Sequence, residues 1–202
     1  MLQTSGIKLL EIIKNSYLKA SEMHDEGDTL QAMHQNRSRF WVDCLANRFK
    51  SEFSDDDIGV FSKYNSSNRE TFGLNELLYD VVVCRLGYTR AAVQKRELPY
   101  IQQVIWQIES EFALDTREIL IDFSKLVLGS APYKLFIGSA SKNNDKILDV
   151  LIPVANNCSG QVFISFIPHP KNWKGPDTYG LSVYEFRKAT SDELKATWVQ
   201  RS

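Results

Sequence analysis

The sequence predicts an α/β protein in which helices flank a mixed β-sheet and a helical extension precedes the sheet. Three observations support this prediction. Apolar residues near the N-terminus recur at helical spacing. Later apolar runs are short and rich in β-branched and aliphatic residues, which is typical of strands. Residues 103–138 also read as strand, helix and strand within the length of one crossover unit, so the two strands should be parallel and joined in a right-handed sense.

Two helices are predicted in the N-terminal part. The first covers residues 5–23, whose aliphatic residues lie three and four positions apart. The second begins after Asp28, a good N-cap, and runs towards Phe49. We therefore expect residues 1–53 to pack as a helical segment on a core formed by residues 54–202, in one domain overall.

The core is predicted from short apolar runs separated by turn-rich or polar segments. Residues 54–70 are expected to be turns and loop around a short apolar piece, and residues 87–98 a polar connection. A capping-box spacing at Asp115 to Glu118 opens a helix that ends near residue 129. The remaining helix is expected at 145–154, and the strands at 77–86, 101–112, 133–137, 161–167 and 181–186.

Three acidic residues lie in or beside apolar runs. Because side chains alternate along a strand, Glu109 and Glu111 point to one side, while Val104 and Trp106 point to the other. Asp80 lies within a second apolar run, where a charged side chain is costly unless it is paired or bound to a cation. Three acids on two strands therefore predict a metal site.

Carboxylate oxygens are the ligands that hard divalent cations prefer, so Mg²⁺ or Mn²⁺ is the expected occupant. Such an ion can activate water and offset charge on a phosphate, which is the chemistry of phosphodiester hydrolysis. Other chemistries fit less well. Same-face acids on one strand cannot flank a sugar, and the sequence has no Gly-x-Ser-x-Gly motif, phosphate-cradling Gly-rich loop or dinucleotide fingerprint.

The order of a helix, the Asp80 strand, the Glu109-Ser110-Glu111 strand, a helix and a further strand covers residues 37–138. This order resembles the core of the PD-(D/E)XK nuclease superfamily, to which many restriction endonucleases belong. The resemblance implies a restriction-endonuclease-like fold with Asp80 and Glu109 as metal ligands. Glu111 stands where Lys is usual; some restriction enzymes of the family have Glu there, and others take Lys from the following helix, where Lys125 is the candidate.

Two functions follow as hypotheses. The first is a Mg²⁺-dependent nuclease acting on DNA, in which Asp80 and Glu109 bind the metal and Lys125 stabilises developing charge. Glu111 completes the site as a further metal ligand or as a base that positions water. The second is a catalytically inactive nuclease-fold module that binds nucleic acid or a protein partner. Such a module could be a subunit of a bacterial defence or restriction system, or associate as a homodimer or with a partner through its N-terminal helices.

Composition limits the partners and the compartment. Lys and Arg number 24 against 25 Asp and Glu, so no overall basic field attracts nucleic acid and a polyanion must meet a local basic face. The second predicted helix offers one, formed by Arg37, Arg39, Arg48 and Lys50. The three cysteines are expected to be reduced core residues. The sequence shows no membrane span or secretory signal, which predicts a cytoplasmic location and no membrane partner.

Overall fold

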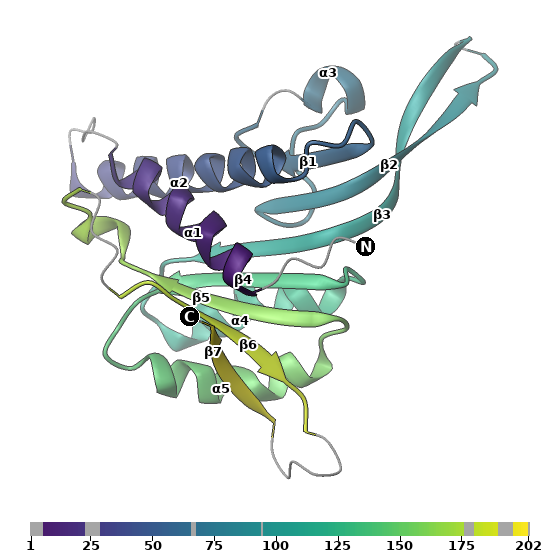
Figure 1. Cartoon of the computed structure of the whole chain (residues 1–202). Coiled ribbons are helices and arrows are strands. Elements are labelled where there is room, and N and C mark those ends of the chain that lie inside the picture. Colours follow the sequence, from purple (N-terminus) through teal and green to yellow (C-terminus); the bar gives the residue numbers. More distant parts are fainter. Residues whose placement is uncertain are drawn as a thin grey trace.

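A seven-stranded β-sheet forms the centre of the structure, and its strands lie side by side in chain order (Figure 1). The structure is a computed structural model that describes residues 6–22, 29–65, 68–93, 95–175, 180–189 and 196–201. The β3–β4 and β4–β5 pairs are parallel and the others are antiparallel, so the sheet is mixed, as predicted. The strands are β1 (Ile58–Ser62), β2 (Val81–Ala91), β3 (Arg96–Glu111), β4 (Tyr133–Ser139), β5 (Gln161–Ile167), β6 (Ser182–Arg187) and β7 (Thr197–Arg201).

Helices cover both faces of the sheet (Figure 1). Helices α1 and α2 share one buried apolar cluster with Trp106 and Ile108 of β3. Helices α4 and α5 share a second cluster with Val82 of β2 and Phe136 of β4. The helices are α1 (Gly6–Ser21), α2 (Leu30–Glu52), α3 (Arg69–Phe72), α4 (Thr116–Lys125) and α5 (Asn144–Asn157), with 3₁₀ turns at η2 (Leu126–Leu128) and η3 (Pro170–Asn172).

The N-terminal helices form where the apolar spacing predicts them. The stripe of α1 packs into the core through Leu9, Ile12, Ile13, Tyr17 and Ala20, so these side chains are not available to a partner. The predicted cap Asp28 lies outside the described residues. Thr29 is the N-cap of α2, and its Oγ1 accepts a hydrogen bond from the Ala32 N–H at 3.1 Å.

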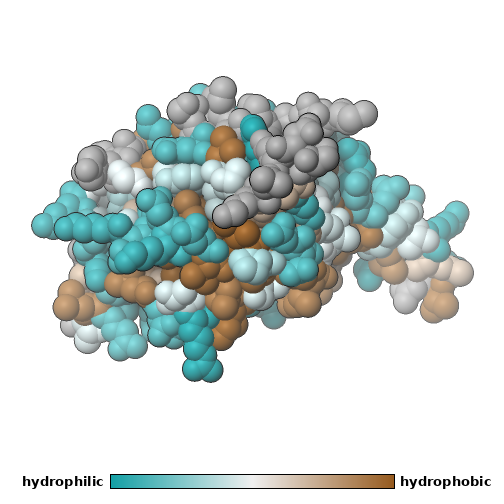
Figure 2. Space-filling model, turned by 90° about the horizontal axis from the view of Figure 1, so that it is seen from below, coloured by the Kyte–Doolittle hydropathy of each residue, from teal (hydrophilic) through white to brown (hydrophobic). Residues whose placement is uncertain are grey.

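Two segments that the sequence predicts as loop or connection are strand. Within 54–70, β1 pairs with the first residues of β2. The prediction of a polar connection at 87–98 is also wrong, because β2 and β3 continue through these residues as one long hairpin. Figure 2, which views the molecule from below, shows this hairpin protruding at the right of the body. Its residues are polar because they are exposed on both faces, so no apolar alternation marks them as strand.

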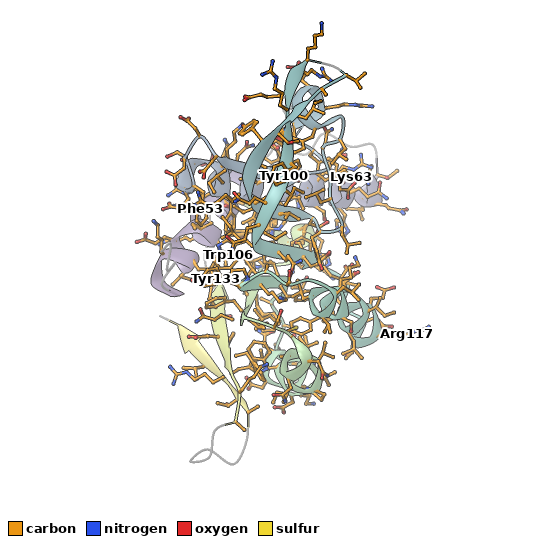
Figure 3. All side chains as sticks on the ribbon, turned by 90° about the vertical axis from the view of Figure 1, so that its right-hand side faces the viewer. Phe53, Lys63, Tyr100, Trp106, Arg117 and Tyr133 are labelled. Atoms are coloured by element: carbon orange, nitrogen blue, oxygen red, sulfur yellow. The ribbon has the colours of Figure 1, made fainter. Side chains whose placement is uncertain are left out.

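In the middle of β3, side chains depart from simple alternation. Val83 pairs with Trp106 but Cys84 pairs with Val104, which leaves Ile105 as the extra residue of a β-bulge. The bulge turns Val104 towards the α4/α5 cluster and away from the face of Trp106, so the predicted shared face of those two residues is wrong. Beyond the bulge, Trp106 stacks on Tyr133 with ring centroids 4.9 Å apart (Figure 3).

Other expectations are met in part. The predicted strand at 77–86 begins later, at Val81, which leaves Asp80 just before β2.

Strand β7 (Thr197–Arg201), which pairs with β6, is not predicted from the sequence. The three cysteines, Cys44, Cys84 and Cys158, are buried and free, as expected. Among the described residues, we find no helix with the length and apolar character needed to cross a membrane.

Candidate functional site

Asp80 and Glu109 meet at one end of the β2–β3 pair. Val81 pairs with Ile108 in the antiparallel register, and the same register carried one residue further sets Asp80 opposite Glu109. The backbone N–H of Ser110 donates a hydrogen bond to Asp80 Oδ2 at 2.9 Å. The strand pairing therefore brings together two predicted site residues that are 29 positions apart in the sequence.

Glu109 is nearly inaccessible to solvent, with 3% of its surface exposed. Its Oε2 lies 3.4 Å from Lys125 Nζ, whereas its Oε1 is buried and has no hydrogen-bond partner in the described part of the chain. Burial, followed by the negative charge of Asp80, raises the pKa of Glu109 to about 8, although Lys125 opposes the shift. An unpartnered buried carboxylate oxygen is costly, and a proton or a cation would relieve that cost.

Asp80 is also held where its charged form is disfavoured. Burial raises the pKa of Asp80 to about 6, while the hydrogen bond from Ser110 and the charge of Lys125 act in the opposite direction. Two neighbouring carboxyl groups with raised pKa values are typical of a site that takes up a proton or a positive charge.

Helix α4 supplies the cation of this cluster. The carboxylate of Asp115 caps the helix by accepting from the Arg117 N–H at 2.7 Å, as the capping box predicts. At the other end, Lys125 Nζ lies 2.6 Å from Asp122 Oδ1, and its side chain is 39% exposed. Tyr79, the residue before Asp80, donates its hydroxyl to the Lys125 carbonyl at 3.1 Å. This contact joins the last turn of α4 to the start of β2.

Glu111 lies in a different set of contacts from the Asp80–Glu109 pair. Its Oε1 accepts a hydrogen bond from the Ala113 N–H at 2.5 Å. Burial raises the pKa of Glu111, and so does a hydrogen bond with the carboxyl group of Asp122. Two carboxyl groups that share a hydrogen bond hold a proton between them. Asp122 therefore links Glu111 to Lys125, and through Lys125 to Glu109.

Asp122 is the residue of this cluster that sequence reasoning left out of the site. The sequence marks Asp122 only weakly as a site residue, because an acid and a lysine three positions apart on a helix most often form a solvated surface pair. What distinguishes Asp122 is its position beside the buried Glu109 and the half-buried Glu111 of β3. That position depends on how α4 packs against β3.

A cavity of about 300 Å³ opens beside Asp80 and Ser110. Helix α2 provides most of its other wall through His34, Gln35, Ser38, Arg39 and Val42, and Tyr64 completes it. A phosphate entering this cavity would find the guanidinium of Arg39 and the hydroxyl of Ser38 as donors.

The predicted basic face of α2 does not form as one surface. Arg37 is buried and donates from Nη1 to the Pro170 carbonyl at 2.6 Å, so it ties α2 to η3. Arg48 lines a separate cavity between α1 and α2. Of the four basic residues, Arg39 alone is among those that line the cavity beside Asp80.

Within the described ranges, no group of three or more His, Cys, Asp or Glu side chains is arranged to hold a metal ion. Magnesium, however, is commonly held by one or two carboxylates together with water and substrate oxygens. Asp80 and Glu109 offer two carboxylates, and the unpartnered Glu109 Oε1 offers a ligand atom that nothing else described engages. These two residues therefore fit a magnesium ion.

Neither the protein-family models nor the curated proteins contain a match to this chain. The fold and the site define an α/β protein with a mixed seven-stranded sheet and a buried carboxylate pair at the end of two adjacent strands. Function is therefore inferred from the chemistry of these side chains.

Proposed function

We propose that this chain is a Mg²⁺- or Mn²⁺-dependent nuclease that hydrolyses phosphodiester bonds of DNA. The observation that supports this most directly is the pair of buried carboxyl groups, Asp80 and Glu109, with one glutamate oxygen left unpartnered. A cation bound there would convert an unfavourable pair of acids into a favourable ligand set.

The element order gives a second line of support. Over residues 37–138 the chain runs through α2, β2, β3, α4 and β4, with α3 and β1 as small additions before β2. That is the order on which the resemblance to the PD-(D/E)XK superfamily rests. Membership of that superfamily and a restriction-endonuclease-like identity for the fold are parts of the proposal.

In the proposed mechanism, Asp80 and Glu109 would hold the ion. When bound, the ion supplies water of lowered pKa and offsets charge on the phosphate. Lys125, held in place by Asp122, lies beside Glu109 and stabilises negative charge that develops on the phosphate oxygens. Glu111, whose pKa is raised, takes the proton from the attacking water or serves as a further ligand.

Substrate positioning is assigned to the cavity beside Asp80. Arg39 projects from α2 into its lining and can bind a non-bridging phosphate oxygen. His34 and Ser38, which lie four residues apart on the same face of α2, provide further polar groups. The DNA strand would therefore cross the end of the β2–β3 pair, with Arg39 of α2 on one face of the sheet and Lys125 of α4 on the other.

The test is cleavage of plasmid, linear duplex and single-stranded DNA with Mg²⁺ or Mn²⁺, using Asp80→Asn, Glu109→Gln and Glu111→Gln. Glu118→Gln is the matched control, since Glu118 is an exposed acid on α4. We expect the Asp80 and Glu109 variants to lose cleavage and, by calorimetric titration, Mn²⁺ binding as well. Circular dichroism should show that each variant keeps its fold.

A second candidate is a nuclease-fold module that binds nucleic acid or a protein partner without cutting. It is favoured by one observation, the engagement of Lys125 with both Asp122 and Glu109, which leaves its charge already balanced. A wild-type protein that binds DNA but neither cleaves it nor takes up Mn²⁺ would support this candidate over the nuclease. A cytoplasmic location and association through the N-terminal helices stay predictions.

A further inference from the structure

The hairpin formed by β2 and β3 extends well beyond the strands that flank it. Strand β1 pairs with β2 over residues 58–62 and 81–85, and β4 pairs with β3 over residues 106–111. Residues 87–91 and 96–100 therefore pair only with each other, and Figure 1 shows this part of the hairpin projecting away from the sheet and its helices. We call residues 87–100 the hairpin arm.

The hairpin arm is exposed on both of its faces. Tyr88 is 55% exposed, Tyr100 is 46% exposed, and Val93 near the turn is 90% exposed. Isolated two-stranded ribbons are marginally stable in water. The arm therefore depends on its continuity with the sheet and leaves large side chains in solvent, an arrangement that a binding surface would explain.

The hairpin arm is basic in a chain whose net charge is −1. It contains Arg90, Lys95 and Arg96 against the single acid Glu97, so three positive charges and one negative charge make its net charge +2. All four side chains are exposed. Figure 3 shows side chains ending in nitrogen at the far end of the hairpin.

Lys95 occupies a backbone conformation that glycine would adopt more easily. Its φ is 52°, and no other non-glycine residue among those described has a positive φ. A cation is thus present at a turn position where the backbone favours glycine. Unfavourable backbone conformations tend to be kept where the side chain is used.

The arm is poorly suited to pairing with a strand of another protein or a second copy of this chain. Pro99 has no N–H to donate to an added strand, and the register shift between Arg85 and Leu86 interrupts the ladder at the base of the arm. Positive charges along the open edges also discourage strand addition. The charge of the arm instead complements a polyanion.

We propose that the hairpin arm enters the major groove of B-form DNA, with its basic residues on the phosphates and Tyr88 against sugars and base edges. A two-stranded ribbon fits the major groove, which is about 12 Å wide. The narrow major groove of A-form RNA would not admit it.

This inference rests on the proposed function, since it places the arm and the acid pair on one duplex. Side chains alternate along β2, and Val82 and Cys84 face the α4/α5 cluster. The same alternation puts Asp80, Tyr88 and Arg90 on that face. Ten residues of strand separate Asp80 from Arg90, roughly 33 Å at the usual rise, which is about one turn of B-DNA.

The experiment measures binding of a fluorescein-labelled 40-base-pair duplex by anisotropy, in EDTA, at salt concentrations from 50 to 200 mM. Binding in EDTA isolates recognition from cleavage. The test variant carries Arg90→Ala, Lys95→Ala and Arg96→Ala. The matched control loses the same charge elsewhere, through alanine at three exposed lysines, Lys14, Lys142 and Lys174.

We expect the arm variant to bind at least tenfold more weakly than wild type and to lower the salt slope by about 2 to 3, because each phosphate contact contributes about 0.9. The control should change affinity less than threefold. Tyr88→Ala should weaken binding without changing the salt slope, because Tyr88 carries no charge. Circular dichroism should be unchanged for these exposed positions.

Equal losses in the arm variant and the control would overturn the proposal, since attraction would then be unspecific. Wild-type binding that is no stronger to duplex DNA than to duplex RNA or single strands would also overturn it. So would a dimer by light scattering that the arm substitutions convert to monomer, since a second copy would then occupy the arm. Asp80→Asn separates the two proposals: if it cleaves like wild type, the acid site fails while arm-dependent binding stands.

Discussion

Substitution of Glu109 by Gln tests the buried acid pair through the pH dependence of folding. Burial and the neighbouring Asp80 raise the pKa of Glu109 from 4.5 to about 8. In the unfolded chain this group loses its proton near pH 4.5, whereas in the folded protein it keeps the proton until about pH 8. The folded state therefore binds more protons in this interval, and stability falls as pH rises through it.

The magnitude follows from the number of protons involved. One proton held by the folded state but not by the unfolded state costs roughly 1.4 kcal/mol per pH unit. Between pH 5 and pH 7 the loss from Glu109 is therefore about 3 kcal/mol. Because Glu109 is only 3% exposed, solvent screening reduces this value little.

The measurement is the free energy of unfolding by urea at pH 5, 6, 7 and 8 in EDTA. Glu109→Gln keeps the shape of the side chain but has no titratable group, so we expect its stability curve to be flatter and to cross that of wild type. Glu11→Gln, a change at an exposed acid on α1, is the control and should follow wild type.

The reasoning would be refuted if wild type gained stability between pH 5 and pH 7, or if Glu109→Gln kept the wild-type slope. Addition of Mg²⁺ gives a second result from the same experiment. A cation binds the deprotonated carboxylates, so it should stabilise wild type most at pH 8 and leave Glu109→Gln almost unaffected.

Three further predictions address neighbouring features. Lys125→Met removes a charge that lowers the pKa of Glu109, so the pH-dependent loss of stability should extend to higher pH and cleavage should fall at least 100-fold; an unchanged pH profile would contradict this. Trp41→Phe removes the hydrogen bond of 2.9 Å from the indole N–H to a serine hydroxyl at the end of β3 and should cost about 1–2 kcal/mol in urea unfolding. Gly160→Ala should cost about 1–3 kcal/mol, because φ is 73° and the new Cβ would lie 2.5 Å from a proline carbonyl oxygen. Gly73→Ala, with φ of 77° but open space around it, should cost less, and equal losses would show that the clash is unimportant.

Local sequence pattern is sufficient to predict the helices that bury one apolar face and the strands that are buried along their whole length. The stripe of α1, the capping box before α4 and the apolar runs of β4 and β5 each mark their structure within a few residues. The presence of acids within apolar runs likewise marks Asp80 and Glu109 as unusual, since burial of a charge needs compensation. The metal and the nuclease activity stay predictions.

Tertiary structure decided what depends on partners far along the chain. Strand β1 is recognisable only from its pairing with β2, the hairpin arm has no apolar face to mark it, and the bulge at Ile105 reverses the side that Val104 faces. The clustering of Asp80, Glu109, Glu111 and Asp122 also depends on elements that are distant in the sequence, since these residues come from the start of β2, from β3 and from α4.

The sequence by itself determined that Glu109 and Glu111 leave the same side of one strand, because alternation is a local property of the backbone. Only the tertiary structure decided what each glutamate meets. The β2–β3 pairing set Asp80 beside Glu109, and the packing of α4 brought Lys125 to Glu109 and Asp122 to Glu111. Spacing along a strand determines direction, whereas the neighbours that a side chain meets depend on elements brought together by burial of the core.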